Sequence, residues 1–144
     1  MKVEDILKAK GRAVQTTWPD ATVSTAIRRL MTMGIGALVV SREGERVDGV
    51  ISERDIVRGL NKHGAKLLDM RVGDVMSQQV PICSSHDSIK HVMEQMTRTR
   101  HRHLPVVDDG KLCGLVSIGD VVKHRLEEME LETNVLREHY IARR

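Results

Sequence analysis

The sequence predicts an α/β (α+β) protein in which two β-α-β-β-α units pack as a pseudo-twofold pair, with an additional helix at the C-terminus. The main observation is an internal repeat, because GVISERD at 49–55 recurs as GLVSIGD at 114–120, about 65 residues later. Upstream of these strings, VQTTWPDATV at 14–23 corresponds to VPICSSHDSI at 80–89. A single unit of about 50 residues could hardly bury enough surface to fold alone. We therefore expect the two units to pack their sheets together.

Each unit begins with an extended segment and a helix. The extended segments are 14–17 and 80–83. Short polar residues that suit a helix N-cap follow them, and behind these the apolar residues recur with helical spacing. The apolar residues of the two predicted helices are Val23, Ala26, Ile27 and Leu30 in the first unit, and Ile89, Val92, Met93 and Met96 in the second.

The second half of each unit is predicted to be a β-hairpin that leads into another helix. In both units two apolar runs flank a turn that contains glycine, REGE in the first unit and DDGK in the second. The predicted strands are 37–40 and 47–51 in the first unit, and 104–107 and 112–116 in the second. The helices that follow should start near Ser52 and Ser117.

We divide the chain into three parts. The first domain is 1–66, with a short N-terminal helix, the second domain is 67–130, and a C-terminal helical extension is 131–144. A long helix is predicted over 121–140, and one stripe of it is apolar, so that it could cover either the core or a partner subunit. The stripe consists of Val122, Leu126, Met129, Leu136 and Tyr140.

The composition favours a soluble globular protein with an aliphatic core. Hydrophobic residues make up 40% of the chain and charged residues 30%, but there is no Phe and only one Trp and one Tyr. Few aromatic side chains leave few surfaces on which bases could stack. The net charge is only +3, and RTRHRH at 98–103 is the one marked concentration of positive charge. We therefore do not expect nucleic acid as a partner.

The sequence indicates a cytoplasmic protein without a metal site. Cys83 and Cys113 are isolated and lack the spacing of metal ligands, which fits a reducing compartment. No apolar run approaches the roughly 18 residues that a membrane span needs. The N-terminal MKVEDILKAKG lacks the apolar region of a signal peptide. We expect no association with a membrane.

Both repeated strings contain S-x-x-D, which permits two interpretations. The motif resembles a capping box, which stabilises a helix start and needs no ligand. The same residues could also bind one, because a helix N-terminus suits phosphate and a carboxylate can accept from both ribose hydroxyls. The residues are Ser52 with Asp55, and Ser117 with Asp120. Gly49 and Gly114 begin the two strings, and they either allow close packing or leave room for a ligand.

The repeat resembles a tandem pair of CBS (cystathionine β-synthase) domains, often called a Bateman module. The strings DATVSTAI, IGALVV, GVISERDIVRGL and HRHLPVVDDGKLCGLVSIGDVV carry the resemblance, over roughly residues 11–126. The chain is similar to small stand-alone bacterial proteins that consist of one such pair. The resemblance implies a regulatory protein without catalytic activity, which binds AMP, ADP, ATP, S-adenosylmethionine or NAD(H) between its domains. It also implies a homodimer that regulates an unknown protein.

The resemblance further implies two ligand sites, in which the Asp contacts ribose and the Ser makes a polar contact. One site is expected to contain Thr16, Thr17, Ile35, Arg102, His103, Ser117, Ile118 and Asp120. The other is expected to contain Gly36, Ala37, Ser52, Arg54, Asp55, Val80, Pro81 and Ile82.

The resemblance also implies that the strand start at Arg102 and His103, within the basic cluster 98–103, faces the phosphates of the ligand. RHLPVV at 102–107 corresponds to IGALVV at 35–40, so Arg102 and His103 stand where the first unit has small apolar residues. An arginine fork suits phosphate because it donates two hydrogen bonds at once. Arg100 is a further candidate for a phosphate contact.

Three other functions are alternatives to this one. An enzyme is not expected, because the chain has no nucleophile elbow, HExxH, Walker loop or metal-ligand set. A nucleic-acid-binding protein that uses 98–103 would bind with a steep salt dependence. A ligand-free dimerisation adaptor would not need the Ser and Asp that both units contain.

Overall fold

The computed structural model describes residues 1–142 of the 144-residue chain. The first unit contains a small sheet in the order β1-β2-β3, with β1 parallel and β3 antiparallel to the central β2. All four residues of β2 are buried. The elements of this unit are β1 (Thr16–Thr17), α2 (Val23–Met33), β2 (Ala37–Val40), β3 (Gly49–Ser52), α3 (Glu53–His63) and the 3₁₀ helix η1 (Gly64–Asp69).

The second unit repeats this arrangement. Its elements are α5 (Ile89–Thr99), β4 (His103–Asp108), β5 (Lys111–Ser117) and α6 (Ile118–Ala142). The strands β4 and β5 form an antiparallel hairpin. The predicted extended segment 80–83 contributes one parallel bridge, between Cys83 and Val106. Pro81 in this segment has no N–H to donate to a ladder.

Local sequence explains where the helices begin. Thr22 caps α2 by accepting a hydrogen bond from the backbone N–H of Thr25, and Ser88 caps α5 by accepting from His91. A hydroxyl in this position satisfies one of the free N–H groups of the first turn. The two predicted helices therefore start at the residues that the polar N-cap candidates indicated.

Each of the two remaining helices packs against the other unit, and not against the unit that it precedes in the sequence. The first helix α1 (Val3–Lys10) lies on the second unit, where the backbone N–H of Val3 donates to Asp87 O at 2.9 Å. The short helix α4 (Val72–Val75) lies on the first unit, where Val72 donates to Ala21 O at 2.8 Å. The predicted limits 1–66 and 67–130 divide the chain by the sequence repeat, whereas α1 contributes to the second core.

The two cores are aliphatic, as the composition indicates. The first consists of Ala26, Leu30, Leu38, Val40, Ile51 and Val72. The second consists of Val3, Ile6, Leu7, Cys83, Ile89, Val92, Met96, Leu104, Val106, Val116 and Val121. The predicted α/β fold of two similar units with a C-terminal helix is confirmed.

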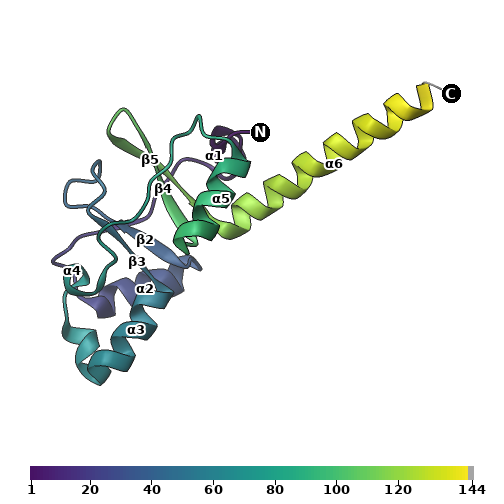
Figure 1. Cartoon of the computed structure of the whole chain (residues 1–144). Coiled ribbons are helices and arrows are strands. Elements are labelled where there is room, and N and C mark those ends of the chain that lie inside the picture. The colour runs from purple at the N-terminus through teal and green to yellow at the C-terminus, as the bar shows by residue number, and fades with distance from the viewer. Residues whose placement is uncertain (143–144) are drawn as a thin grey trace.

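The helix α6 begins in the second unit and then leaves it. Its first turns contact α5, α1 and β5, and its remaining turns extend away from both units (Figure 1). Val121 is fully buried, whereas Leu126 is 61% exposed and Leu136 70% exposed. The apolar stripe therefore does not cover the core. Of the predicted extension 131–144, residues 143 and 144 lie outside the described part.

No helix within the described range 1–142 combines the length and the apolar character that crossing a membrane requires.

Candidate ligand-binding site

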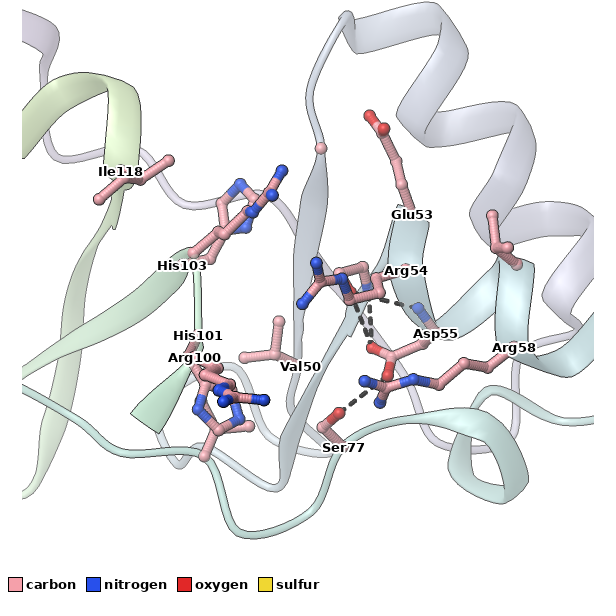
Figure 2. A pocket seen from close by; sticks show the side chains of 15 residues that line it. Val50, Glu53, Arg54, Asp55, Arg58, Ser77, Arg100, His101, His103 and Ile118 are labelled. Atoms are coloured by element: carbon pink, nitrogen blue, oxygen red, sulfur yellow. Dashed lines mark hydrogen bonds between the residues drawn. The ribbon is translucent and has the colours of Figure 1, made fainter. Parts of the chain in front are cut away.

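A cavity of about 550 Å³ is lined by both units, and we call it the Asp55 cavity. Figure 2 shows Arg54 and Arg58 of α3 across from Arg100, His101 and His103 of the second unit. The remaining lining residues come from β3, α3, the 77–80 segment, the start of α6 and the residues just before β2 and β4. They are Gly36, Val50, Ser52, Glu53, Asp55, Val57, Ser77, Val80, Arg102 and Ile118.

Asp55 is held at the N-terminus of α3 by hydrogen bonds. Its Oδ2 accepts from the backbone N–H of Ser52 at 2.9 Å and from the Ser52 hydroxyl at 3.0 Å. Its Oδ1 accepts from the Ser77 hydroxyl at 2.8 Å (Figure 2). The backbone N–H of Asp55 lies 3.4 Å from Ser52 Oγ, which completes a capping box. The motif thus caps the helix and also fixes a carboxylate in the cavity wall.

Four arginines line the same cavity from two directions. Arg58 follows Arg54 by one turn on α3, and Arg100 and Arg102 lie between the end of α5 and the start of β4. Against them stand the carboxylates of Glu53 and Asp55. The cavity therefore combines an excess of guanidinium groups with the N-terminus of α3, which is a combination that suits phosphate.

The backbone of Arg100 adopts a conformation that normally favours glycine. Arg100 is the C-cap of α5, with φ 58° and ψ 33° in the left-handed region. The corresponding C-cap of α2 is Gly34, with φ 62° and ψ 40°. A residue with a Cβ pays a conformational cost of about 1 kcal/mol in this region. The second unit therefore retains a long basic side chain at a position where glycine would be less strained.

His103 lies where the two units meet. A Cβ added to Gly36 would lie 3.3 Å from His103 Nε2 and 3.4 Å from Glu53 Oε1, so these three residues converge closely. Burial lowers the pKa of His103, and the positive charge of Lys10 lowers it further. The imidazole is therefore expected to be neutral near pH 7 while no anion is bound.

A second cavity of about 450 Å³ lies on the other side of His103, and we call it the Ser117 cavity. Its lining includes Val14, Gln15 and Lys10 in addition to Ser117. Lys10 Nζ donates to Asp120 Oδ2 at 2.7 Å and to Leu115 O at 3.0 Å. Asp120 thus has a lysine of α1 as its direct partner.

The environment of Asp120 favours its charged form. Burial would raise the pKa of this carboxyl, but the hydrogen bonds from Lys10 and from the backbone N–H of Ser117 outweigh it and leave the pKa below its usual value. The Ser117 N–H donates to Oδ2 at 2.9 Å, and the Asp120 N–H donates to Ser117 Oγ at 3.1 Å. The second S-x-x-D motif therefore has the same reciprocal cap as the first.

The structure groups the predicted site residues differently from the sequence repeat. Nine of them line the Asp55 cavity: Gly36, Ser52, Arg54, Asp55, Val80, Arg100, Arg102, His103 and Ile118. The Ser117 cavity is lined by Ile35, Gly36, Ala37, His103 and Ser117. Neither lining includes Thr16, Thr17, Pro81, Ile82 or Asp120.

Three of these placements depart from the expected grouping. Ala37 was expected with Asp55, but it lines the Ser117 cavity. Arg102 and Ile118 were expected with Asp120, but they line the Asp55 cavity. The start of β4 faces the first unit across the junction, so its basic residues meet the α3 motif. The segment before each unit's first strand contributes Val14 to one cavity and Val80 to the other.

Sequence reasoning missed Arg58, Ser77 and Lys10. Arg58 follows Arg54 at helical spacing, and this signal was available. Lys10 and Ser77 follow two further repeated strings, VEDIL at 3–7 and VGDVM at 72–76, which form α1 and the region of α4. Those strings would have indicated that equivalent helices precede both extended segments.

Gly49 and Gly114 are explained by close packing. A Cβ on Gly49 would lie 2.6 Å from the backbone oxygen of Ser77, and one on Gly114 would lie 2.6 Å from Leu7 Cδ2. Neither glycine lines the Asp55 cavity or the Ser117 cavity. Of the two interpretations, the structure favours the approach of α1 and of the 76–77 segment over room for a ligand.

In the described part of the chain, no three His, Cys, Asp or Glu side chains are grouped so that they could hold a metal ion.

The fold and the paired S-x-x-D motifs define a tandem pair of CBS domains. The CBS domain family matches residues 3–62 and 72–127. The chain therefore belongs to this family, and the resemblance inferred from the sequence is confirmed.

The comparisons with individual proteins agree. CBS domain-containing protein CBSX3, mitochondrial, of Arabidopsis thaliana is 34% identical over 134 residues, which are 88% of this chain and 65% of that protein. This chain thus spans less than two thirds of CBSX3. The crystal structure of a CBS-domain containing protein from Agrobacterium tumefaciens is 40% identical, with a TM-score of 0.83 over 87% of this chain and 99% of the other.

The solved structures similar to this chain include complexes with ligands. The structure of CBSX2 in complex with AMP is 26% identical, has a TM-score of 0.71, and covers 89% of this chain and 98% of that one.

Proposed function

We propose that this protein is a regulatory module that binds an adenosine-containing ligand in the Asp55 cavity. The observation that carries the proposal is the meeting, in one cavity, of the Ser52–Asp55 motif with four arginines drawn from two units. The AMP complex of the related CBSX2 supports the class of ligand. AMP, ADP, ATP, S-adenosylmethionine and NAD(H) belong to this class, and the phosphate-bearing members fit the arginines.

Each part of the cavity has a role in this proposal. Asp55 accepts hydrogen bonds from the ribose, and its Oδ1 already accepts from the hydroxyl of Ser77 in the same way. The guanidinium groups of Arg54, Arg100 and Arg102 bind phosphate by charge-assisted hydrogen bonds. The adenine lies against apolar lining side chains such as Val80.

We further propose that each chain binds one ligand tightly. The partner of Asp55 is a neutral hydroxyl, whereas the partner of Asp120 is the charged Lys10. A ribose that approached Asp120 would have to replace an ion pair. The Ser117 cavity also lacks the four arginines, since its basic lining residues are Lys10 and His103.

The ligand would regulate by changing the relative position of the two units. It contacts α3 of the first unit and the start of β4 of the second, so its affinity depends on how they are placed. A ligand shifts such an equilibrium only by its difference in affinity for the two states. We propose a homodimer that transmits this shift to a regulated protein, without catalysis of its own, and we expect it in the cytoplasm.

Calorimetric titration tests the ligand proposal. Nucleotide-stripped protein is titrated with AMP, ATP, NAD+, NADH and S-adenosylmethionine, and with a short DNA duplex at two salt concentrations. We expect micromolar binding of a phosphate-bearing adenosine ligand at one site per chain. Salt-sensitive DNA binding with silent nucleotides would instead mean that 98–103 binds a polymer.

A pair of matched variants tests the site. Asp55→Asn should weaken binding by about 1.5–3 kcal/mol, the range for a hydrogen bond to a charged group. Asp120→Asn changes the equivalent residue of the other motif and should leave the affinity within about twofold, roughly the scatter between independent sites. Circular dichroism checks that both variants fold. If Asp55→Asn binds as tightly as the wild type, the proposed site is wrong.

A further inference from the structure

The exposed stripe of α6 has the spacing of a coiled coil. Its positions alternate at intervals of four and three residues, as the a and d positions of a heptad do. They are Val122, Leu126, Met129, Thr133, Leu136 and Tyr140, and we call them the α6 seam. Val122, Leu126, Met129 and Leu136 are between 41% and 70% exposed. Thr133 satisfies its hydroxyl within the helix, by donating to Met129 O at 2.9 Å.

The rest of the molecule leaves this face uncovered. The opposite face of α6 is the one that packs, since Val121 is 0% and His124 9% exposed. From Met129 to Ile141 every residue is exposed. A helix end that extends into solvent with an apolar stripe is marginally stable, because packing supplies most helical stability in proteins. We therefore expect another helix to pack against the stripe.

The charges beside the seam indicate which helix packs against it and in which orientation. With Leu126 and Thr133 at a positions, Arg125 and Glu132 occupy g positions, and Glu130 and Arg137 occupy e positions. In a parallel pair, g faces the e position of the next heptad on the other helix. Arg125 then faces Glu130 of a second copy, and Glu132 faces its Arg137. Both contacts are attractive, and symmetry repeats each of them.

The antiparallel alternative has the opposite electrostatics. In the register centred between Met129 and Thr133, e faces e and g faces g across the seam. Glu130 would then face Glu130 of the second copy, and Glu132 would face Glu132. Both contacts repel. The charge pattern therefore discriminates between the two orientations of a pair of identical helices.

We propose that two copies of this chain associate through the α6 seam as a parallel two-stranded coiled coil. This inference rests on the proposed homodimer, and it specifies the surface, the orientation and the register. Arg125 also bonds Glu128 of its own chain. Arg125 approaches Glu132 of its own chain only at 3.9 Å, so the contact between Glu132 and Arg137 of the second copy is the better one to test.

Sedimentation equilibrium over a range of concentrations tests the seam. The seam variant carries Leu126→Glu and Leu136→Glu, and its dissociation constant should rise on the order of 100-fold, because two apolar layers are lost. The control variant carries Leu131→Glu and Val135→Glu. These residues are 56% and 61% exposed on the same helix but lie off the seam, so the dimer should persist.

The orientation is tested by exchanging charges. Glu132→Arg and Arg137→Glu should each weaken the homodimer by about tenfold, and an equimolar mixture of the two variants should associate as tightly as the wild type. In the antiparallel register Glu132→Arg would replace one repulsion by another and change little. Unweakened single variants, or a mixture that does not recover, would overturn the parallel arrangement.

The remaining outcomes are distinct from failure of the ligand proposal. A seam variant that remains dimeric, or a control that dissociates equally, shows that the seam is not the contact, while the proposed homodimer holds. A monomeric wild type overturns the seam and the homodimer together. Nucleotide titration of the same variants is a separate measurement, and we expect the seam substitutions to leave it unchanged.

Discussion

Ser77 is a side-chain partner of Asp55 and Lys10 is one of Asp120, and the difference between these two partners decides how the two motifs can act. Ser77 presents a neutral hydroxyl to Asp55, 2.8 Å from Oδ1. Lys10 presents a charged amine to Asp120, 2.7 Å from Oδ2. A hydroxyl can be joined or replaced by a ribose hydroxyl at little cost, whereas loss of the lysine would leave a partly buried carboxylate without its counter-charge.

Lys10→Met should therefore allow the second motif, Ser117 with Asp120, to bind the ligand. The variant keeps the aliphatic part of the side chain and removes the charge, so we expect a second, weaker binding event for the ligand of the Asp55 cavity in calorimetry. The control is Lys8→Met, an exposed lysine of the same helix, which should leave one event per chain. A single event in Lys10→Met would show that the lysine is not what closes this motif.

The difference in free energy of unfolding between the wild type and Lys10→Met should depend on pH. The partner lysine depresses the folded-state pKa of Asp120, so the ion pair stabilises the protein above the ordinary carboxyl pKa of about 4 and is lost as the pH falls through the depressed value. Because both side chains are partly exposed, the contribution at neutral pH should be at most about 1 kcal/mol. Urea unfolding of wild type and Lys10→Met should give free energies that differ at pH 7 and converge as the pH falls through the depressed pKa of Asp120.

The elements that were predicted well are those in which the pattern is local. The strand 37–40 and the helices that follow Thr22 and Ser88 depend on short apolar runs and on hydroxyl caps, which a sequence displays directly. The exchange of α1 and α4 between the units was not predictable in this way. It depends on contacts between segments about 85 residues apart, such as that of Val3 with Asp87.

In the candidate site, too, local patterns were predictable and the packing of the two units was not. Ser52 and Asp55 were identified because they recur, and Arg100, Arg102 and His103 because they cluster. Their meeting in one cavity depends on how the two units face each other, and the repeat does not encode this. The alignment of the two repeats therefore placed Arg102 in the site with Asp120. Residues without a repeat of their own type, such as Lys10, had no pattern to indicate a role.

At the scale of elements, Gly49 should be indispensable to the packing of β3 against the 76–77 segment. Gly49→Ala places a Cβ 2.6 Å from the backbone oxygen of Ser77 and 2.8 Å from Met76 Sδ, so the backbone must move. We expect a loss of about 1–3 kcal/mol in the free energy of unfolding, as for other overpacked positions. Urea denaturation measures this loss.

A second glycine provides the control for that substitution. Gly119 lies in the first turn of α6, and a Cβ there would meet only Ser117 Oγ at 3.6 Å, which is ordinary contact. Gly119→Ala should be neutral or stabilise the protein by up to about 1 kcal/mol, because alanine favours helix. Equal losses in the two variants would show that close approach is not the function of Gly49.

At the scale of the whole molecule, the Asp55 cavity makes ligand binding a property of both units together. Asp55 and its helix belong to the first unit, and Arg100 and Arg102 belong to the second. A ligand that contacts both adds a link across the junction, where α1 already connects the N-terminus to the second core. Binding should therefore stabilise the molecule as one cooperative body rather than one unit alone.

Thermal unfolding measures this link. At a ligand concentration of 100 times Kd, a ligand that binds only the folded protein should stabilise it by about 2.7 kcal/mol and raise Tm in a single transition. The double variant Arg100→Ala, Arg102→Ala removes only contacts from the second unit, and it should lose most of this shift. Arg98→Ala removes an exposed arginine of the same cluster that does not line the cavity, so its shift should equal that of the wild type. If ligand raises the Tm of the double variant as much as that of the wild type, the second unit takes no part in binding, and the ligand cannot couple the two units in the way proposed.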